Sequence, residues 1–333
     1  MREKLVVALL VVAFVMAPTV PMTEGVQTEK PLVIATIAPI ASIVQEAFPQ
    51  VRVVVLIPPG VDPHEYQMTA KQVELVQKAS VIVTTGGHLP VERRILELRN
   101  SGEIEARVLL VQDYFKYGFR YLKESWYNNK DNPHGVWLDP YNAIAIAEAT
   151  EKALIQSDPS RRTEYTITFE RFRARVLGIV DSYRALIRSN GTAIVQMPPD
   201  QYALEWLGLR VVDSLKPEEE IPSKGIDELL PESKTADVLV YGLDSPEQMK
   251  NAMKELAAKS GKPLAGITVF WSSGNYTEWL VKNTATIIRT INSGECPSLK
   301  ECPEEGGTTE RYVFLSLLTG IVLGTAIGVV LKR

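Results

Sequence analysis

Three histidines are the residues of this chain whose type and position best suit metal binding. His64 lies in LIPPGVDPHEYQMT and His134 in DNPHGVWLDP, so each follows a proline in a loop marked by proline and glycine. The proline restrains the backbone that leads into each histidine. His88 follows Gly86 and Gly87 at the end of a predicted strand. A neutral imidazole suits zinc, manganese, nickel or copper. One such histidine alone is more often an ordinary hydrogen-bonded residue, but two on strand-end loops of one predicted lobe favour a metal site.

Composition narrows the function classes. The chain has 333 residues, with 36 lysines and arginines against 40 acidic residues and a net charge of −4. Nucleic-acid binding is not expected, because it favours a basic excess. Two cysteines cannot form a four-cysteine zinc site. A metal-dependent hydrolase would need Glu65 or Asp62 as a base beside the histidines. The chain has neither a His-Glu-x-x-His pair nor a Gly-x-Ser-x-Gly elbow, so we expect no enzyme.

The elements that would position these histidines form an α/β pattern. Short apolar strands are predicted at 31–37, 51–58, 80–87, 106–111, 192–196, 209–214, 236–242 and 263–271. Helices are predicted between them, and a long helix over 159–189 separates the two series. Alternating strands and helices indicate parallel sheets. We therefore expect two similar lobes, 26–158 and 190–291, bridged by the 159–189 helix, with a ligand cleft between them.

Both ends of the chain predict an export route. Residues 1–25 have a positive start followed by an apolar run, which is typical of a secretory signal. Residues 312–331 are uncharged and apolar, and Lys332 and Arg333 follow them. This pattern predicts a transmembrane helix in the cell membrane, with the body extracytoplasmic and the C-terminus cytoplasmic. Residues 292–311 would be a linker, in which Cys296 and Cys302 are expected to pair.

Two of the histidine loops resemble a known family. LIPPGVDPHEYQMT and PHGVWLDPYNA are similar to the first two metal-ligand loops of the solute-binding receptors of zinc and manganese ABC importers, the cluster A-I or TroA-like family. GGHLPVE resembles a family segment whose histidine lies near the site without being a ligand, and PEEEIPSKGIDELL resembles a proline-serine turn of the second lobe. The resemblance covers residues 31–291.

The resemblance implies a monomeric receptor that binds a divalent metal in the cleft and delivers it to an ABC permease. His64 and His134 match the two first-lobe ligands. Zinc is the expected ion, with manganese or copper as alternatives. Two imidazoles would still need a carboxylate or a third imidazole to complete a four-coordinate site.

The second lobe departs from the family pattern. Met197 occupies the position of the third ligand, and the last strand is followed by no carboxylate. Asp200, Glu205 or Asp244 could supply the missing oxygen. Met197 could instead be a thioether ligand, which would favour Cu(I), or a packing residue. A degraded site would fit another function, namely a surface protein that serves adhesion or binds a non-metal ligand.

Overall fold

The computed structural model of the chain describes residues 30–187, 191–218 and 221–294. Its N-terminal half, residues 30–158, contains a four-stranded parallel sheet in the order β2-β1-β3-β4. The strands are β1 (Leu32–Ala35), β2 (Arg52–Val55), β3 (Val81–Val83) and β4 (Arg107–Leu109). The central strands β1 and β3 are buried along their whole length, as expected for a parallel sheet covered on both faces. All four strands agree with the apolar runs predicted from the sequence.

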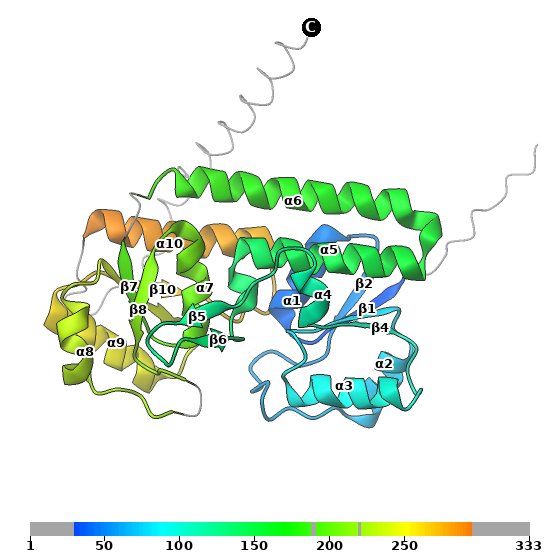
Figure 1. Cartoon of the computed structure of the whole chain (residues 1–333), viewed down its shortest axis with the longest axis horizontal. Helices are drawn as coiled ribbons and strands as arrows, with labels where there is room; N and C mark the ends of the chain where they lie inside the picture. The colour runs from blue at the N-terminus through cyan, green and yellow to red at the C-terminus, as the bar shows by residue number, and fades with distance from the viewer. Residues whose placement is uncertain (1–29, 188–190, 219–220, 295–333) are drawn as a thin grey trace, which may run out of the picture.

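Five helices accompany this sheet, and the first three of them connect its strands (Figure 1). They are α1 (Ala38–Ala47), α2 (Ala70–Gln77), α3 (Pro90–Asn100), α4 (Val111–Phe115) and α5 (Pro140–Ser157). A capping box starts α2, because Thr69 and Gln72 satisfy each other's backbone N–H groups. The short α4 has too few residues to show helical periodicity, and the sequence did not predict it.

The C-terminal half, residues 191–294, repeats the same topology. Its parallel sheet has the order β10-β9-β7-β8, so the first strand in sequence again lies between the second and the third. The strands are β7 (Thr192–Val195), β8 (Arg210–Ser214), β9 (Val238–Gly242) and β10 (Leu264–Ile267). The helices are α7 (Gln201–Leu204), α8 (Ile226–Ser233), α9 (Glu247–Ser260) and α10 (Tyr276–Ser293). The predicted pair of similar α/β halves is confirmed.

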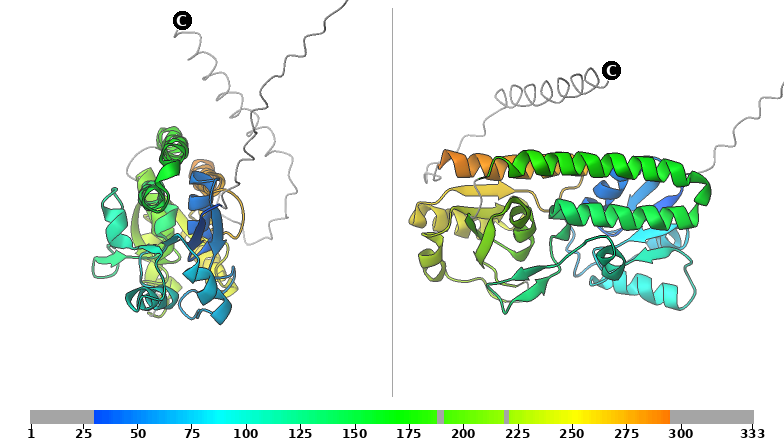
Figure 2. Two further views of the ribbon diagram at one scale, coloured as in Figure 1. Left: turned by 90° about the vertical axis from the view of Figure 1, so that its right-hand side faces the viewer. Right: turned by 45° about the horizontal axis from the view of Figure 1, so that its top comes forward.

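The long helix α6 (Arg162–Arg184) joins the two halves. It contacts α1 and α5 of the N-terminal half and α10 of the C-terminal half. Figure 2 shows it running along the long axis of the molecule. Phe169, Phe172 and Val176 form part of its buried stripe, as their spacing predicts. With 23 residues, α6 is shorter than the predicted helix over 159–189. At its N-terminal side the difference arises because Pro159–Arg161 forms a separate 3-10 turn.

A small antiparallel hairpin was not predicted. Strands β5 (Leu122–Glu124) and β6 (Lys130–Asn132) are too short and too polar to show an alternating pattern. The hairpin belongs to the N-terminal half in sequence but binds the C-terminal half. The Ser125 hydroxyl donates to the Val211 carbonyl at 3.2 Å, and the Trp126 indole donates to the Pro217 carbonyl at 3.1 Å.

Several predicted features lie outside the described residues. These are the signal at 1–25, Cys296 and Cys302, and the span at 312–331. Among the helices between residues 30 and 294 that the structure describes, none combines the length and the apolar character that crossing a membrane requires.

Candidate metal site

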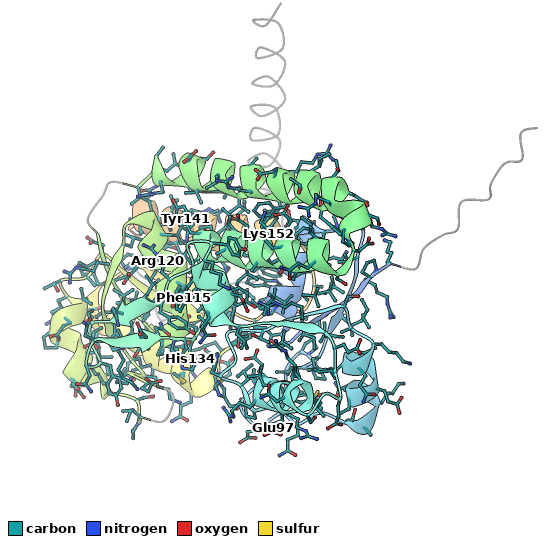
Figure 3. All side chains as sticks on the ribbon, turned by 45° about the vertical axis from the view of Figure 1, so that its right-hand side comes forward. Glu97, Phe115, Arg120, His134, Tyr141 and Lys152 are labelled. Carbon is teal, nitrogen blue, oxygen red and sulfur yellow. The ribbon has the colours of Figure 1, made fainter. Side chains whose placement is uncertain are left out.

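The three histidines gather around one pocket. The pocket has a volume of about 120 Å³ and lies between the loops of both halves. The ring centroids of His64 and His88 are 6.1 Å apart, and each lies 5.8 Å from the centroid of His134. The rings therefore form a nearly equilateral triangle. Figure 3 shows His134 at the junction of the two halves.

His64 and His134 are presented by the same local structure. The sequences are Asp-Pro-His and Asn-Pro-His, and in both the histidine N–H donates to the side chain two residues earlier. The N–H of His64 donates to Asp62 Oδ1 at 2.8 Å, and that of His134 to Asn132 Oδ1 at 2.9 Å. This is an Asx turn, which fixes the backbone that carries each imidazole.

The loop that carries His88 is held by a buried carboxylate. The loop between β3 and α3 folds around Glu92, which is fully buried and accepts hydrogen bonds from the backbone N–H groups of Thr85 and Gly87 at 2.6 and 2.9 Å. The turn uses two glycines with φ of 139° and 99°, Gly86 and Gly87. Thr85 Oγ1 lies 3.4 Å from His88 Nδ1. The loop that the resemblance assigned to a bystander histidine therefore places His88 in the same triangle as the other two.

The C-terminal half lines the pocket with apolar groups. These are Met197, Pro198, Pro199 and Phe270. The Phe270 ring contacts Trp137 with centroids 5.1 Å apart. We call these four residues the apolar wall. Gly135 contacts it so closely that a Cβ there would lie 2.5 Å from the Pro199 Cα.

The carboxylates suggested as substitute ligands have other partners. Asp244 is exposed, and its oxygens accept the N–H groups of Val269 and Phe270 at 3.1 and 2.6 Å. Asp200 is buried and accepts the Met197 N–H at 3.1 Å, whereas Glu205 accepts from the Gln201 amide at 2.8 Å. None of the three lines the pocket, whereas Met197 does. The structure thus brings together His64, His134 and Met197 and leaves Asp244 outside.

Burial keeps two of the imidazoles uncharged. Burial first, and then the neighbouring His88, lower the pKa of His134 to about 4, against an opposing effect of Glu218. Burial also lowers the pKa of His88, although Glu92 opposes this. Neutral imidazoles are the form that binds metal, so these two side chains need not lose a proton at neutral pH before they bind.

The donor atoms themselves do not yet converge. Among residues 30–187, 191–218 and 221–294, no three His, Cys, Asp or Glu side chains are arranged around one point as the ligands of an ion. The three rings are nevertheless close, with centroids 5.8 to 6.1 Å apart. Rotation about χ2 turns an imidazole nitrogen without moving the ring centroid far, and this torsion is broad for histidine.

Sequence reasoning missed two residues near the site. Glu218 Oε1 lies 3.6 Å from His134 Nε2, and it comes from the loop after β8. Asn132 fixes His134 and also donates through Nδ2 to the Pro198 carbonyl at 2.8 Å. The Asx-Pro-His pattern shared by Asp62 and Asn132 was the available signal for Asn132. Nothing in the sequence indicated that the loop of Glu218 would reach the histidine.

Two relatives of this chain are named as substrate-binding lipoproteins of metal ABC transporters. A metal ABC transporter substrate-binding lipoprotein of Streptococcus mutans, SloC, is 28% identical over 132 residues, which are 36% of this chain and 40% of SloC. The iron ABC transporter substrate-binding lipoprotein MtsA of Streptococcus pyogenes is 26% identical over 166 residues, 46% of this chain and 50% of MtsA. The chain therefore spans about half or less of the length of these curated relatives. A crystal structure of ZnuA has a TM-score of 0.64 at 19% identity, covers 80% of this chain and 100% of its own, and shows the shared fold.

These findings correct the predicted location. We expected a single-pass protein of the cell membrane with an extracytoplasmic body and a cytoplasmic C-terminus. The matching relatives are instead named as lipoproteins, and the matching family as periplasmic. The described residues contain no helix that could span a membrane. The single-pass location is therefore wrong.

The family itself follows from the extent of the match. The model of the family described as ZnuA, zinc-uptake complex component A, periplasmic, matches residues 33–290. That range contains both sheets, the helix that joins them and all three histidines. This protein belongs to the ZnuA family of periplasmic zinc-uptake components.

Proposed function

We propose that this protein is a receptor that captures a divalent transition metal in the histidine pocket and passes it to the permease of an ABC importer. The observation that carries the proposal is the triangle of rings, with centroids 5.8 to 6.1 Å apart. Three imidazoles that share one zinc ion, at a Zn–N distance of about 2.0–2.1 Å, have centroids roughly 5 to 6 Å apart. The metal is cargo, so the protein needs no catalytic group.

The ligands in this proposal are His64, His134 and His88. The first two are the residues that the sequence predicted. His88 replaces the ligand that the C-terminal half lacks, where Met197 occupies the expected position. Rotation of the three rings about χ2 brings one nitrogen of each toward the centre of the pocket.

Zinc is the ion that this donor set favours. Three neutral imidazoles suit a four-coordinate zinc site that keeps one position for water or a further ligand. Manganese, the alternative, favours oxygen ligands, and the one acidic side chain among the residues that line the described pocket, Asp62, already accepts the His64 N–H at 2.8 Å. If Met197 were a ligand, its thioether would favour Cu(I), and the apolar wall would then take part in metal binding.

The test is a calorimetric titration of the full chain with zinc after chelation. We expect one tight equivalent for the wild type and for Glu97→Gln, a control that removes an exposed carboxylate on α3. His64→Ala and His134→Ala should each abolish tight binding. Equal affinity in all four proteins would refute the site.

The same titration also tests the alternative function. If the wild-type protein binds neither zinc, manganese nor Cu(I) tightly, the scaffold serves another purpose, such as adhesion or binding of a non-metal ligand. The apolar wall is the observation that favours this alternative.

A further inference from the structure

Glu218 connects the C-terminal half to the histidines. Its Oε1 lies 3.6 Å from His134 Nε2, and both side chains are largely shielded, with 15% and 17% of their surface exposed. Glu218 is not among the residues that line the pocket, so it contacts the His134 ring without being part of that lining. Unlike Asp200 and Asp244, it is therefore an acidic residue of the C-terminal half that faces one of the rings.

The position of Glu218 is set by the unpredicted hairpin. Lys130 Nζ on β6 lies 3.2 Å from Glu218 Oε2, so the two carboxylate oxygens face different partners. The Trp126 indole N–H donates to the carbonyl of Pro217, the residue just before Glu218. His134 follows β6 by two residues. One short hairpin thus holds both the imidazole and the carboxylate that faces it.

We propose that Glu218 is a positioning residue, whose carboxylate accepts the Nε2–H of His134 and thereby directs Nδ1 of that ring toward the metal. The inference rests on the proposed function. A neutral imidazole has one N–H and one nitrogen with a lone pair, and the partner of the N–H decides which nitrogen binds the ion. Carboxylate–histidine–metal arrangements of this kind orient the ring and increase its basicity. The step from 3.6 Å to a hydrogen bond needs only a small rotation of either side chain.

His88 provides an internal comparison. Its Nδ1 faces Thr85 Oγ1 at 3.4 Å, so Nε2 is the nitrogen directed toward the ion. The two histidines should therefore bind through different nitrogens. If packing alone oriented the rings, we would not expect His88 and His134 to bind the ion through different nitrogens.

The experiment is long-range ¹H–¹⁵N NMR of the full chain with one equivalent of zinc. The chain has three histidines, so each ring can be assigned with single variants in the metal-free state. We expect His134 to bind zinc through Nδ1 with a proton on Nε2, and His88 to bind through Nε2. Coordination of His134 through Nε2 would overturn the proposal, including the case in which Glu218 is itself a ligand. If zinc changes no histidine signal, the proposed function fails instead.

A pair of variants provides a second readout. Glu218→Gln should weaken zinc binding by about 10- to 100-fold, as is usual for the loss of an outer partner, and should mix the two His134 tautomers in the metal-free protein. Asp131→Asn is the matched control, because Asp131 is an exposed acid of the same hairpin that pairs with Lys123. Unchanged affinity and an unchanged tautomer in Glu218→Gln would show that Glu218 does not position the ring. The wild-type spectrum decides the question even if this variant does not fold.

Discussion

The two halves of the molecule have the same strand order and opposite chemistry at the pocket between them. In each half the first strand lies between the second and the third, and all pairings are parallel. Yet the N-terminal half contributes the three histidines, whereas the C-terminal half contributes the apolar wall.

The difference shows that topology and site chemistry are set by separate residues. The sheets require buried aliphatic strands, which both halves have. The ligands depend on the loops that follow those strands, where a substitution costs the fold little. A half that has lost its ligands can therefore keep its shape and still form one side of the pocket.

Removal of one histidine should produce the largest effect. We expect His88→Ala to weaken zinc binding by more than about 100-fold, because loss of an outer partner alone costs 10- to 100-fold and a ligand contributes more. Competition with a zinc-binding dye measures this. A loss of zinc affinity of less than threefold would show that His88 is not a ligand, as the resemblance implies.

Acid should destabilise the histidine side of the pocket. The pKa of His134 is lowered from 6.5 to about 4, so below pH 6.5 the unfolded chain binds the proton more readily than the folded one. Stability is therefore complete above about pH 6.5 and falls toward pH 4, by about 2–3 kcal/mol from this residue.

Urea unfolding of the metal-free chain at pH 7 and pH 4.5 measures this loss. His134→Gln should show a smaller loss between the two pH values than the wild type. An equal loss in both proteins would show that His134 is not the group responsible.

The contact between the His134 loop and the apolar wall can be tested at Gly135. Gly135 has a φ of 78°, and a Cβ there would lie 2.5 Å from the Pro199 Cα and 2.6 Å from its carbonyl oxygen. Gly118 has a φ of 88° and no atom within 4 Å of such a Cβ, so it provides the matched control. Both alanine variants carry the strain of a positive φ, about 1–2 kcal/mol.

Gly135→Ala should cost a further 1–3 kcal/mol, roughly the cost of overpacking, and should also weaken zinc binding. Denaturant midpoints and zinc titration measure the two effects. Equal stability of the two variants would mean that the backbone at Gly135 and Pro199 can move apart without a measurable cost.

Met197 should have the smallest effect on zinc. If the thioether only packs, Met197→Ala changes zinc affinity by less than about threefold, whereas removal of a true ligand would exceed the 10- to 100-fold typical of an outer partner. A much larger loss for Cu(I) than for zinc would show that the sulfur is a ligand for the soft ion. Parallel titrations of both ions decide between the two.

Most of the fold was predictable because it depends on local patterns. The eight strands of the two sheets are short apolar runs, and Gly261 ends α9 in the left-handed conformation expected of a C-cap. The β5–β6 hairpin was not predictable, because its stability comes from contacts with residues about 80 to 90 positions away, such as Val211 and Pro217.

The site was predictable in part. The Pro-His loops and their resemblance to the family's ligand loops predicted His64 and His134 as ligands, and both line the pocket. The inclusion of His88 in the triangle depends on how Glu92 folds its loop, which is a tertiary contact. The proximity of Glu218 depends on the hairpin, so the sequence alone suggested Asp200, Glu205 or Asp244 as the source of a ligand oxygen and did not suggest Glu218.

The most direct test is a crystal structure of the full chain with one equivalent of zinc, with the ion located by anomalous scattering. We expect one ion in the pocket, about 2.0–2.1 Å from a nitrogen of each of His64, His88 and His134. An ion bound by Met197 or Asp244 with His88 turned away, or an ion outside the pocket, would contradict it.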